Sequence, residues 1–415
     1  MRRYLRSLDP ALPRSVYTLQ LGGLFNAFGN GMVLPFTFIY LHNVRGMGLG
    51  TVGLIVGTNA AVSMVAGTVF GTLVDRLGGR HMLAASLLFL AAGFAFFPLI
   101  HHPWEGFLAS TVTGIGNGGF WPAQSTLIAG LTPPERRPAA FALQRVVANL
   151  GIGLGAVAGG LIATTDRPGS FDVLFLVDAA TFLAYLVVLY GFVPEPGTAA
   201  RQQHERPGRY ADVIRHRAFM GVLALNTVFI FAGFSGFELL TVYAKNEADV
   251  SETALGFVFL VNTIVIVLTQ LPIAKLAQGH RRMRTMALLG VVWAASWLLV
   301  PLAGLWVTGV AAAVLLAFAM GVFALGECLH GAVQAPLVAD LAEPRLIGRY
   351  MALSALSWQI GFTAGPAIGG FALSLSPAGV WIAWAAICLL GSAASIMLEP
   401  AIPAGARRTP VAAPA

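Results

Sequence analysis

Long apolar stretches alternate with short polar connectors from one end of the chain to the other. Each stretch is about 20 residues long, which is the length that an α-helix needs to cross the roughly 30 Å hydrocarbon core of a bilayer. The pattern therefore predicts an all-α polytopic membrane protein with twelve transmembrane helices. We expect these helices at 16–41, 50–73, 82–100, 105–130, 139–164, 171–193, 217–241, 252–274, 284–302, 307–338, 349–374 and 378–399.

The composition supports a membrane protein. Hydrophobic residues make up 57% of the chain and charged residues only 10%, whereas a soluble domain carries about 25% charged residues on a surface that must face water. The first apolar stretch is too long for the core of a signal peptide and has no convincing cleavage site, so we expect an uncleaved first helix.

The net charge of +7 raises the question of a nucleic-acid partner, which the positions of the charges answer. Most of the 25 Lys and Arg residues fall in connectors on one side of the predicted helices. By the positive-inside rule this side, with both termini, is cytoplasmic. We therefore expect a protein of the cytoplasmic (inner) cell membrane that binds no nucleic acid. Cys328 and Cys388 lie inside predicted helices, so no disulfide framework is expected.

The longest polar connector divides the chain into two sets of six predicted helices. We expect an N-terminal bundle at 1–193, a cytoplasmic linker at 194–216, a C-terminal bundle at 217–399 and a cytoplasmic tail at 400–415.

The two halves repeat one another. An offset of 210 residues aligns Gln124 with Gln334 and Asn117 with Glu327, and an offset of 203 aligns Asn59 with Asn262. A duplicated six-helix unit is typical of transporters whose substrate site lies between the halves. A helical scaffold that grew by duplication is the alternative.

The connector "GTLVDRLGGRH" (71–81) resembles the loop signature of the major facilitator superfamily, in which Gly71, Asp75, Arg76, Gly78 and Arg80 match. Gly79 stands where an arginine is usual. The resemblance implies a conformational latch, in which the Asp75 carboxylate accepts hydrogen bonds from a facing helix N-terminus or from an arginine across the halves. The matching stretch of the second half, 274–283, keeps the basic charge but has no aspartate. An ordinary basic loop with a stray aspartate is the alternative.

Two predicted helices carry small residues every four positions, which lets neighbouring helices pack at backbone distance. These residues are Gly151, Gly155 and Gly159 in the first half and Gly361, Gly365, Pro366 and Gly369 in the second. Both stretches resemble the antiporter motif of drug:proton exporters, although the Gly-Pro pair occurs here in the eleventh helix instead of the fifth. Tight helix packing alone is the other interpretation.

The whole chain resembles the twelve-helix drug:proton antiporters of the MdtH and LmrP kind, with 114–137 as the most similar stretch. The resemblance implies a major facilitator fold of two pseudo-symmetric six-helix bundles in a monomer, driven by the proton gradient and without cofactor or metal. The arginine usual in the fourth helix is missing from 108–116, so no proton route is expected in the first half.

An ionisable side chain inside a bilayer is costly and is a functional hypothesis by default. Arg145, Asp178, Glu238 and Glu327 fall inside predicted helices, and His330 follows Glu327 by three residues. The repeat aligns Glu327 with Asn117 in the middle of a helix, although a self-contained helix over 305–326 would put it at an end. The resemblance implies that helices 1, 4, 7 and 10 line a cavity. With Arg145 added from helix 5, we expect its lining to include Asn26, Asn30, Asn117, Trp121, Gln124, Arg145, Phe231, Phe234 and Gln334.

Desolvation favours the protonated form of a carboxyl group, which a cationic substrate would displace. We expect Glu327 to be the main proton and cation site, with a hydrogen-bonded structural glutamate or an interfacial one as the alternatives. Glu238 is expected to be a further proton-coupling residue, near the extracellular side, with a gating role. His330 is expected either to relay protons or to be satisfied by a neighbouring helix. Arg145 is expected to pair across helices or to hold an anionic substrate. Asp178 is expected to be structural.

No nucleotide loop, metal spacing or nucleophile motif occurs in a supporting context, so we do not expect an enzyme. The function that we expect is proton-coupled efflux of amphipathic or cationic small molecules. Uptake or facilitated transport of a sugar, organic acid or other metabolite is the main alternative. An integral-membrane enzyme and a non-transporting receptor or scaffold are the alternatives from other classes.

Overall fold

A computed structural model describes residues 12–133, 136–194, 210–343 and 346–409. This part of the chain is helical almost throughout, and β-structure in it is limited to two isolated bridges. The prediction of an all-α protein is therefore confirmed.

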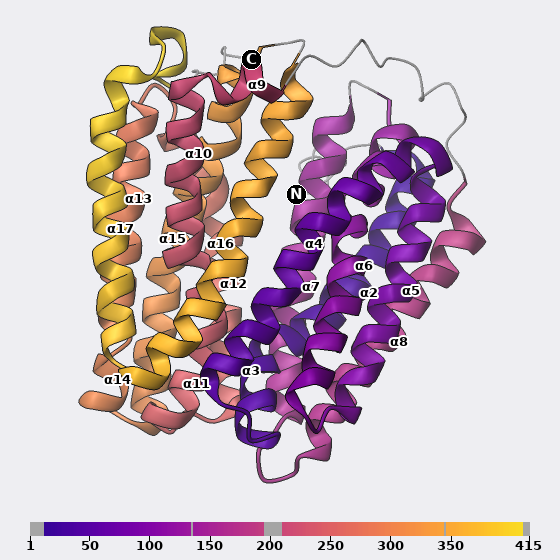
Figure 1. Cartoon of the computed structure of the whole chain (residues 1–415), viewed down its shortest axis with the longest axis vertical. Coiled ribbons are helices and arrows are strands. Elements are labelled where there is room, and N and C mark those ends of the chain that lie inside the picture. The colour runs from indigo at the N-terminus through magenta and orange to yellow at the C-terminus, as the bar shows by residue number, and fades with distance from the viewer. Residues whose placement is uncertain (1–11, 134–135, 195–209, 344–345, 410–415) are drawn as a thin grey trace, which may run out of the picture. The chain divides into compact units, whose positions relative to one another are not determined.

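The chain separates into two compact units (Figure 1). The first comprises Met1–Arg45 and Thr58–Gln203, and the second comprises Gly46–Gly57 and His204–Ala415. Gly46–Gly57 contains the start of helix α4 (Leu49–Leu77) and groups with the second unit. The expected division of the chain at residue 193 placed this segment in the first bundle.

The long helices follow the predicted spans in order. Those of the first half are α2 (Arg14–Val33), α4 (Leu49–Leu77), α5 (Gly79–Phe96), α6 (Pro103–Leu131), α7 (Arg137–Ile162) and α8 (Gly169–Phe192). Those of the second half are α10 (Arg217–Phe229), α11 (Gly236–Ala248), α12 (Glu252–Leu276), α13 (Arg282–Leu299), α15 (Gly309–Leu341), α16 (Ile347–Leu375) and α17 (Gly379–Leu398). Short helices are α3 (Thr37–Ile39), α9 (Tyr210–Ile214) and α14 (Leu302–Leu305).

In the described residues, ten helical segments are long and apolar enough to cross a membrane. The helices α6 and α16 fall outside this set, although each has 29 residues and is long enough to span. Their glycines and their hydroxyl and amide side chains lower the hydropathy of both. The count of twelve spans and the cytoplasmic side of the termini stay predictions.

The first and seventh predicted helices are interrupted. A 3-10 turn at Leu34–Phe36 and a π turn at Tyr40–Val44 follow α2, and a π turn at Ile230–Phe234 joins α10 to α11. Because α11 continues to Ala248, the predicted end of this span at 241 is wrong. Single π turns inside α-helices are frequent at functional sites.

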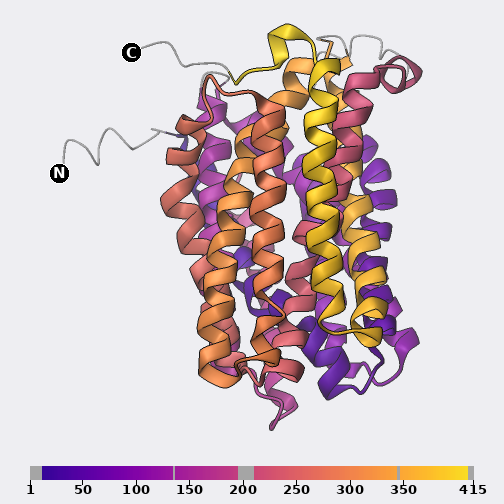
Figure 2. The same cartoon turned by 90° about the vertical axis from the view of Figure 1, so that its left-hand side faces the viewer.

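The two units pair their helices in the same way. In the first unit α2 contacts α7, and α5 contacts α6 and α8. In the second, α10 and the π turn after it contact α16, and α13 contacts α15 and α17. The orange-to-yellow helices of the second unit accordingly lie side by side in Figure 2. The arrangement corresponds to the sequence repeat.

The glycine stripes lie where helices approach most closely. A Cβ atom added at Gly159 of α7 would lie 2.6 Å from the carbonyl oxygen of Met32 on α2, and Gly155 faces the carbonyl oxygen of Phe28. In the second unit a Cβ at Gly361 of α16 would lie 2.6 Å from Cγ2 of Ile230. A larger residue at these positions would separate the helices.

The remaining predicted packing positions show the same close approach. Gly151 faces Ala27 on α2, and Gly365 and Gly369 face Ser235 and Leu239. Pro366 lies inside α16, where transmembrane helices tolerate proline.

Candidate proton-coupling site

Glu327 lies near the middle of α15, which runs without interruption from Gly309 to Leu341. The helix continues through Pro336, so the alternative of a shorter helix that ends at Gly326 is wrong. The side chain of Glu327 is half-buried. The internal repeat therefore predicted correctly that Glu327 lies in the middle of its helix, whereas the apolar run alone would have placed it at a helix end.

Asn262 of α12 binds this carboxylate. Its Nδ2 atom donates a hydrogen bond of 2.7 Å to Oε2 of Glu327, and α12 packs along α15. Among the described residues, Glu327 has this amide partner and forms no ion pair with a basic side chain. A partly desolvated carboxylate that has no basic partner is stabilised when it binds a proton or a cation.

The first unit contains a neutral counterpart of this pair. Nδ2 of Asn117 on α6 donates a hydrogen bond of 3.1 Å to Oδ1 of Asn59 on α4. Nδ2 of Asn59 donates in turn to Oγ1 of Thr113 at 2.7 Å. The offsets of the sequence repeat bring Asn59 onto Asn262 and Asn117 onto Glu327. An interhelical hydrogen bond thus joins the repeat-related residues in both halves, but its direction differs. Asn117 donates to Asn59 in the first unit, whereas Glu327, at the position equivalent to Asn117, accepts from Asn262 in the second.

Asn262 is the site residue that the sequence analysis did not include. Its match with Asn59 was visible in the sequence, but a match of two residues does not show which partner each of them contacts. Only the packing of α12 on α15 joins it to Glu327.

His330 is held by hydrogen bonds and aromatic packing. Its ring is almost fully buried, and Nε2 lies 2.8 Å from Oδ1 of Asn226 on α10. Nδ2 of Asn226 donates to Oγ of Ser357 on α16 at 2.6 Å. The imidazole also stacks on Trp293 and meets the edge of Trp358. These contacts correspond to the alternative in which a neighbouring helix satisfies the histidine.

Glu238 lies in the first turn of α11, directly after the π turn. Its side chain is half-buried, and Oε2 is buried without a hydrogen-bond partner among the described residues. A buried acceptor without a donor costs about 1–3 kcal/mol, and more when it is charged. The site therefore favours a proton or a bound donor on this oxygen.

The predicted cavity residues of the first unit differ in environment. Gln124 is buried and engaged by its own bundle, because Nε2 donates to the Tyr185 hydroxyl at 3.0 Å and Oε1 accepts from Gln144 at 2.6 Å. Asn26 is buried with Nδ2 unpartnered among the described residues, and Asn30 is half-buried. Trp121 and Arg145 are exposed, on α6 and α7.

In the second unit, Gln334 is buried on α15, and neither of its amide atoms has a hydrogen-bond partner in the described part of the chain. Phe231 packs on Trp384 of α17 at a ring distance of 5.3 Å. Phe234 packs against Trp293 and Trp358, each at 5.2 Å. The two phenylalanines contact their own bundle, and their role in lining a cavity stays a prediction.

The predicted latch is only partly visible. Gly78 forms the whole turn between α4 and α5 with φ of 88°, a conformation that requires glycine. Arg80 donates to the carbonyl oxygen of Tyr190 on α8 at 2.8 Å and covers its ring, so its contacts lie within the first unit. Arg76 is exposed, and the space beside Gly71 is open. The side chain of Asp75 lies outside the described residues.

Asp178 is fully buried on α8. Its Oδ1 accepts a hydrogen bond of 3.3 Å from Thr181 and faces Gly29 of α2. Its other oxygen, Oδ2, is buried without a hydrogen-bond partner among the described residues, so the structural role of Asp178 stays a prediction.

Comparison with known proteins identifies the family. A family model described as Major Facilitator Superfamily matches residues 19–247 and 223–413. The chain is 26% identical to the Bacillus subtilis MFS-type transporter YqjV, covering 88% of this chain and 87% of that one. It is 25% identical to the multidrug resistance protein MdtH of Cronobacter sakazakii, covering 95% and 96%.

Solved structures agree with the fold. A crystal structure of a POT family transporter in complex with a thioalcohol-conjugated peptide superimposes with a TM-score of 0.79, at 16% identity, covering 94% of this chain and 97% of that one. The family match over most of the sequence, together with this fold, shows that the chain is a multi-pass membrane transporter of the major facilitator superfamily.

Proposed function

We propose that this protein exports amphipathic or cationic small molecules in exchange for protons by alternating access. The observation that carries the proposal is the Glu327 carboxylate, half-buried in the middle of a membrane helix, with an amide partner and no basic one in the described chain. The similarity to multidrug resistance proteins named MdtH supports export of this substrate class.

The exchange rests on competition for one carboxylate. Without a substrate, a proton neutralises Glu327 at little cost, because a desolvated carboxyl group favours its neutral form. A cationic substrate stabilises the ionised form, and the proton leaves. Each state of the transporter then carries a proton or a cation, which is the condition for coupled exchange.

Asn262 has a positioning role in this scheme. Its amide donates to the carboxyl oxygen, which holds the carboxyl group in one orientation. The counterpart pair Asn117–Asn59 cannot titrate, so in this scheme the first half has no proton site at the equivalent position.

Two further groups are suited to substrate contact. Oε2 of Glu238 and the amide of Gln334 are buried without hydrogen-bond partners among the described residues. Polar groups of this kind on helices that also carry aromatic side chains, such as Phe237 on α11 and Phe323 on α15, suit an amphipathic ligand.

The test is substrate-induced proton flux in proteoliposomes that contain a pH-sensitive dye, with tetraphenylphosphonium as the lipophilic cation. Wild-type protein should move protons against the cation, and Glu327→Gln should abolish this flux. Glu343→Gln, which makes the same chemical change on an exposed side chain after α15, should leave the flux unchanged.

Coupled exchange in Glu327→Gln at the wild-type rate would refute the role of this carboxylate. Downhill movement of a neutral sugar by the wild-type protein, with no dependence on pH, would instead favour the metabolite carrier. The two results are separable, because the first concerns the residue and the second concerns the substrate class.

A further inference from the structure

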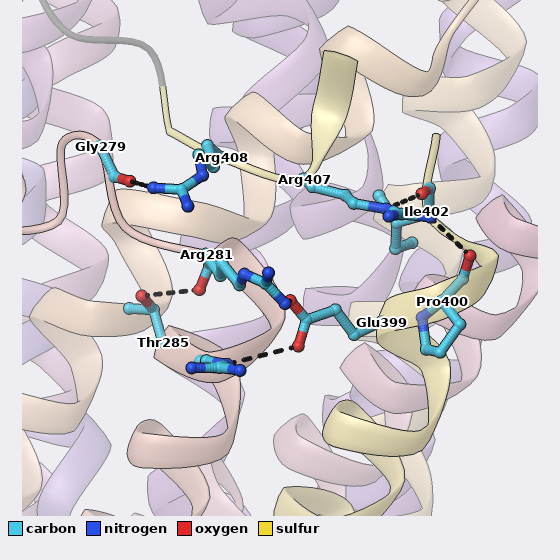
Figure 3. A network of polar contacts seen from close by, with 9 residues as sticks. Gly279, Arg281, Thr285, Glu399, Pro400, Ile402, Arg407 and Arg408 are labelled. Carbon is cyan, nitrogen blue, oxygen red and sulfur yellow. Dashed lines mark hydrogen bonds and ion pairs between the residues drawn. The ribbon is translucent and has the colours of Figure 1, made fainter. Parts of the chain in front are cut away.

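A basic cavity lies in the second unit beside the C-terminal segment, and its lining does not include Glu327. It has a volume of about 380 Å³ and is lined by His280, Arg281, Arg284, Leu288 and Arg408, together with Gly279 and Thr285. Figure 3 shows how the loop before α13 and the C-terminal segment meet here.

The C-terminal segment builds one wall of this cavity through backbone hydrogen bonds. Thr409 accepts from the Gly279 amide at 2.9 Å, and its own amide donates to the His280 carbonyl oxygen at 3.0 Å. The Arg282 amide donates to the carbonyl oxygen of Arg407 at 2.8 Å. These bonds fix Arg408 beside the loop before any ligand binds.

The charges in the cavity are not balanced. Glu399 pairs with Arg281 at 2.9 Å and with Arg284 at 3.6 Å (Figure 3). Arg408 donates to the Gly279 carbonyl oxygen at 2.9 Å, which carries no formal charge. In the described part of the chain, the carboxylate of Glu399 is thus the acidic partner of both Arg281 and Arg284, and Arg408 has only a neutral acceptor, although each guanidinium group has five N–H donors. Guanidinium groups bind phosphate through paired hydrogen bonds.

An apolar stripe continues from the cavity along α13. Leu288, Val291 and Leu298 are each about half exposed, and they follow Arg281 and Arg284 at intervals of three, four or seven residues. Side chains at this spacing lie on one face of a helix. The face therefore carries cations at one end and exposed apolar side chains over the rest of its length.

This combination matches an amphiphile with a negatively charged head. Free phosphate would use the guanidinium groups but not the stripe, and a neutral lipid would use the stripe but not the net positive charge. We propose that the cavity binds the headgroup phosphate of an anionic phospholipid, whose acyl chain lies along the exposed face of α13. The proposal concerns the C-terminal side of the second unit and does not depend on the transported substrate.

Lipid retention measures the proposal directly. The detergent-purified protein is mixed with equal amounts of phosphatidylglycerol and phosphatidylcholine, and bound lipid is counted by native mass spectrometry. Wild-type protein should retain phosphatidylglycerol preferentially. A basic residue beside an anionic headgroup changes affinity by about fivefold, so Arg284→Gln with Arg408→Gln should weaken retention roughly 30-fold.

The matched control is Arg215→Gln with Arg217→Gln, which removes the same charge from exposed positions of the same unit. This variant should retain the lipid as the wild type does. Arg284→Gln alone removes an exposed side chain and its ion pair with Glu399, but it leaves the backbone hydrogen bonds of the C-terminal segment in place. It should still weaken retention about fivefold if the double variant fails to fold.

Three results would overturn the proposal. Equal retention by the Arg284 variants and the control would show that these arginines do not bind the headgroup. Equal retention of the two lipids would show that charge does not select the ligand. Thermal stabilisation by inorganic phosphate that equals stabilisation by phosphatidylglycerol would show a site for a free anion instead of a lipid.

Discussion

The hydrogen bond between Asn262 and Glu327 predicts a specific coupling in stability. In a double-mutant cycle, Asn262 and Glu327 are replaced by alanine one at a time and then together. The loss in free energy of unfolding of the double variant, minus the losses of the two single variants, gives the interaction energy of the pair. Interhelical hydrogen bonds in membrane proteins average about 0.6 kcal/mol and reach about 1.7 kcal/mol.

The Asn262–Glu327 bond is 2.7 Å long and ends on a carboxyl group. Both cycles are measured at alkaline pH, where this group is ionised, and a bond to an ionised group is roughly twice as strong as a neutral one. We therefore expect a coupling of about 1.5 kcal/mol, near the upper end of the membrane range. The counterpart pair Asn117–Asn59 is longer, at 3.1 Å, and neutral on both sides. For it we expect about 0.6 kcal/mol.

The assay is reversible unfolding in mixed micelles, followed by tryptophan fluorescence, with both cycles measured under the same conditions. Glu327→Gln serves as an additional variant, because its amide oxygen can still accept from Asn262. A coupling at Asn262–Glu327 no larger than that of the counterpart pair would refute the reasoning that the carboxyl group strengthens this contact.

Three further predictions concern packing and accessibility. Gly159→Val should lower the free energy of unfolding by about 1–3 kcal/mol or more through overpacking against α2. Gly191 has open space around it, so Gly191→Ala should change this free energy little. Equal effects of the two substitutions in thermal unfolding would contradict the packing argument. His330→Ala should destabilise the protein by about 2–5 kcal/mol, because it leaves a cavity among aromatic rings. A variant as stable as the wild type in the same assay would show that the His330 ring does not contribute to packing. The thiols of Cys328 and Cys388 are free and buried, so a maleimide should label them only after unfolding; rapid labelling of the native protein, read by mass spectrometry, would contradict their burial.

The sequence predicts the order of the helices well. Hydropathy indicates most of the expected spans, because an apolar stretch of this length has few other stable states in a membrane, whereas α6 and α16 are less apolar than the other long helices. The repeat places Glu327 within its helix, since matched halves share register. The helix ends are predicted less well. The seventh span contains a π turn at Ile230–Phe234 and continues to Ala248, and neither feature has a signal in the hydropathy pattern.

The contacts of the site could be predicted only in part. The residue types at Glu327 and Asn262 are visible in the sequence, but their hydrogen bond depends on how α12 and α15 face one another. The same limit applies to His330, whose partners Asn226 and Ser357 come from two other helices. Side chains far apart in sequence meet through helix rotation, which periodicity does not determine.

The most direct measurement of the central claim is proton release upon binding. Tetraphenylphosphonium is added to the detergent-purified protein in weakly buffered solution near neutral pH, and the pH change is calibrated with acid. The account predicts close to a single proton released for each cation bound by the wild type, and almost none in Glu327→Gln. Equal release from both proteins, or cation binding by the wild type without release, would contradict it.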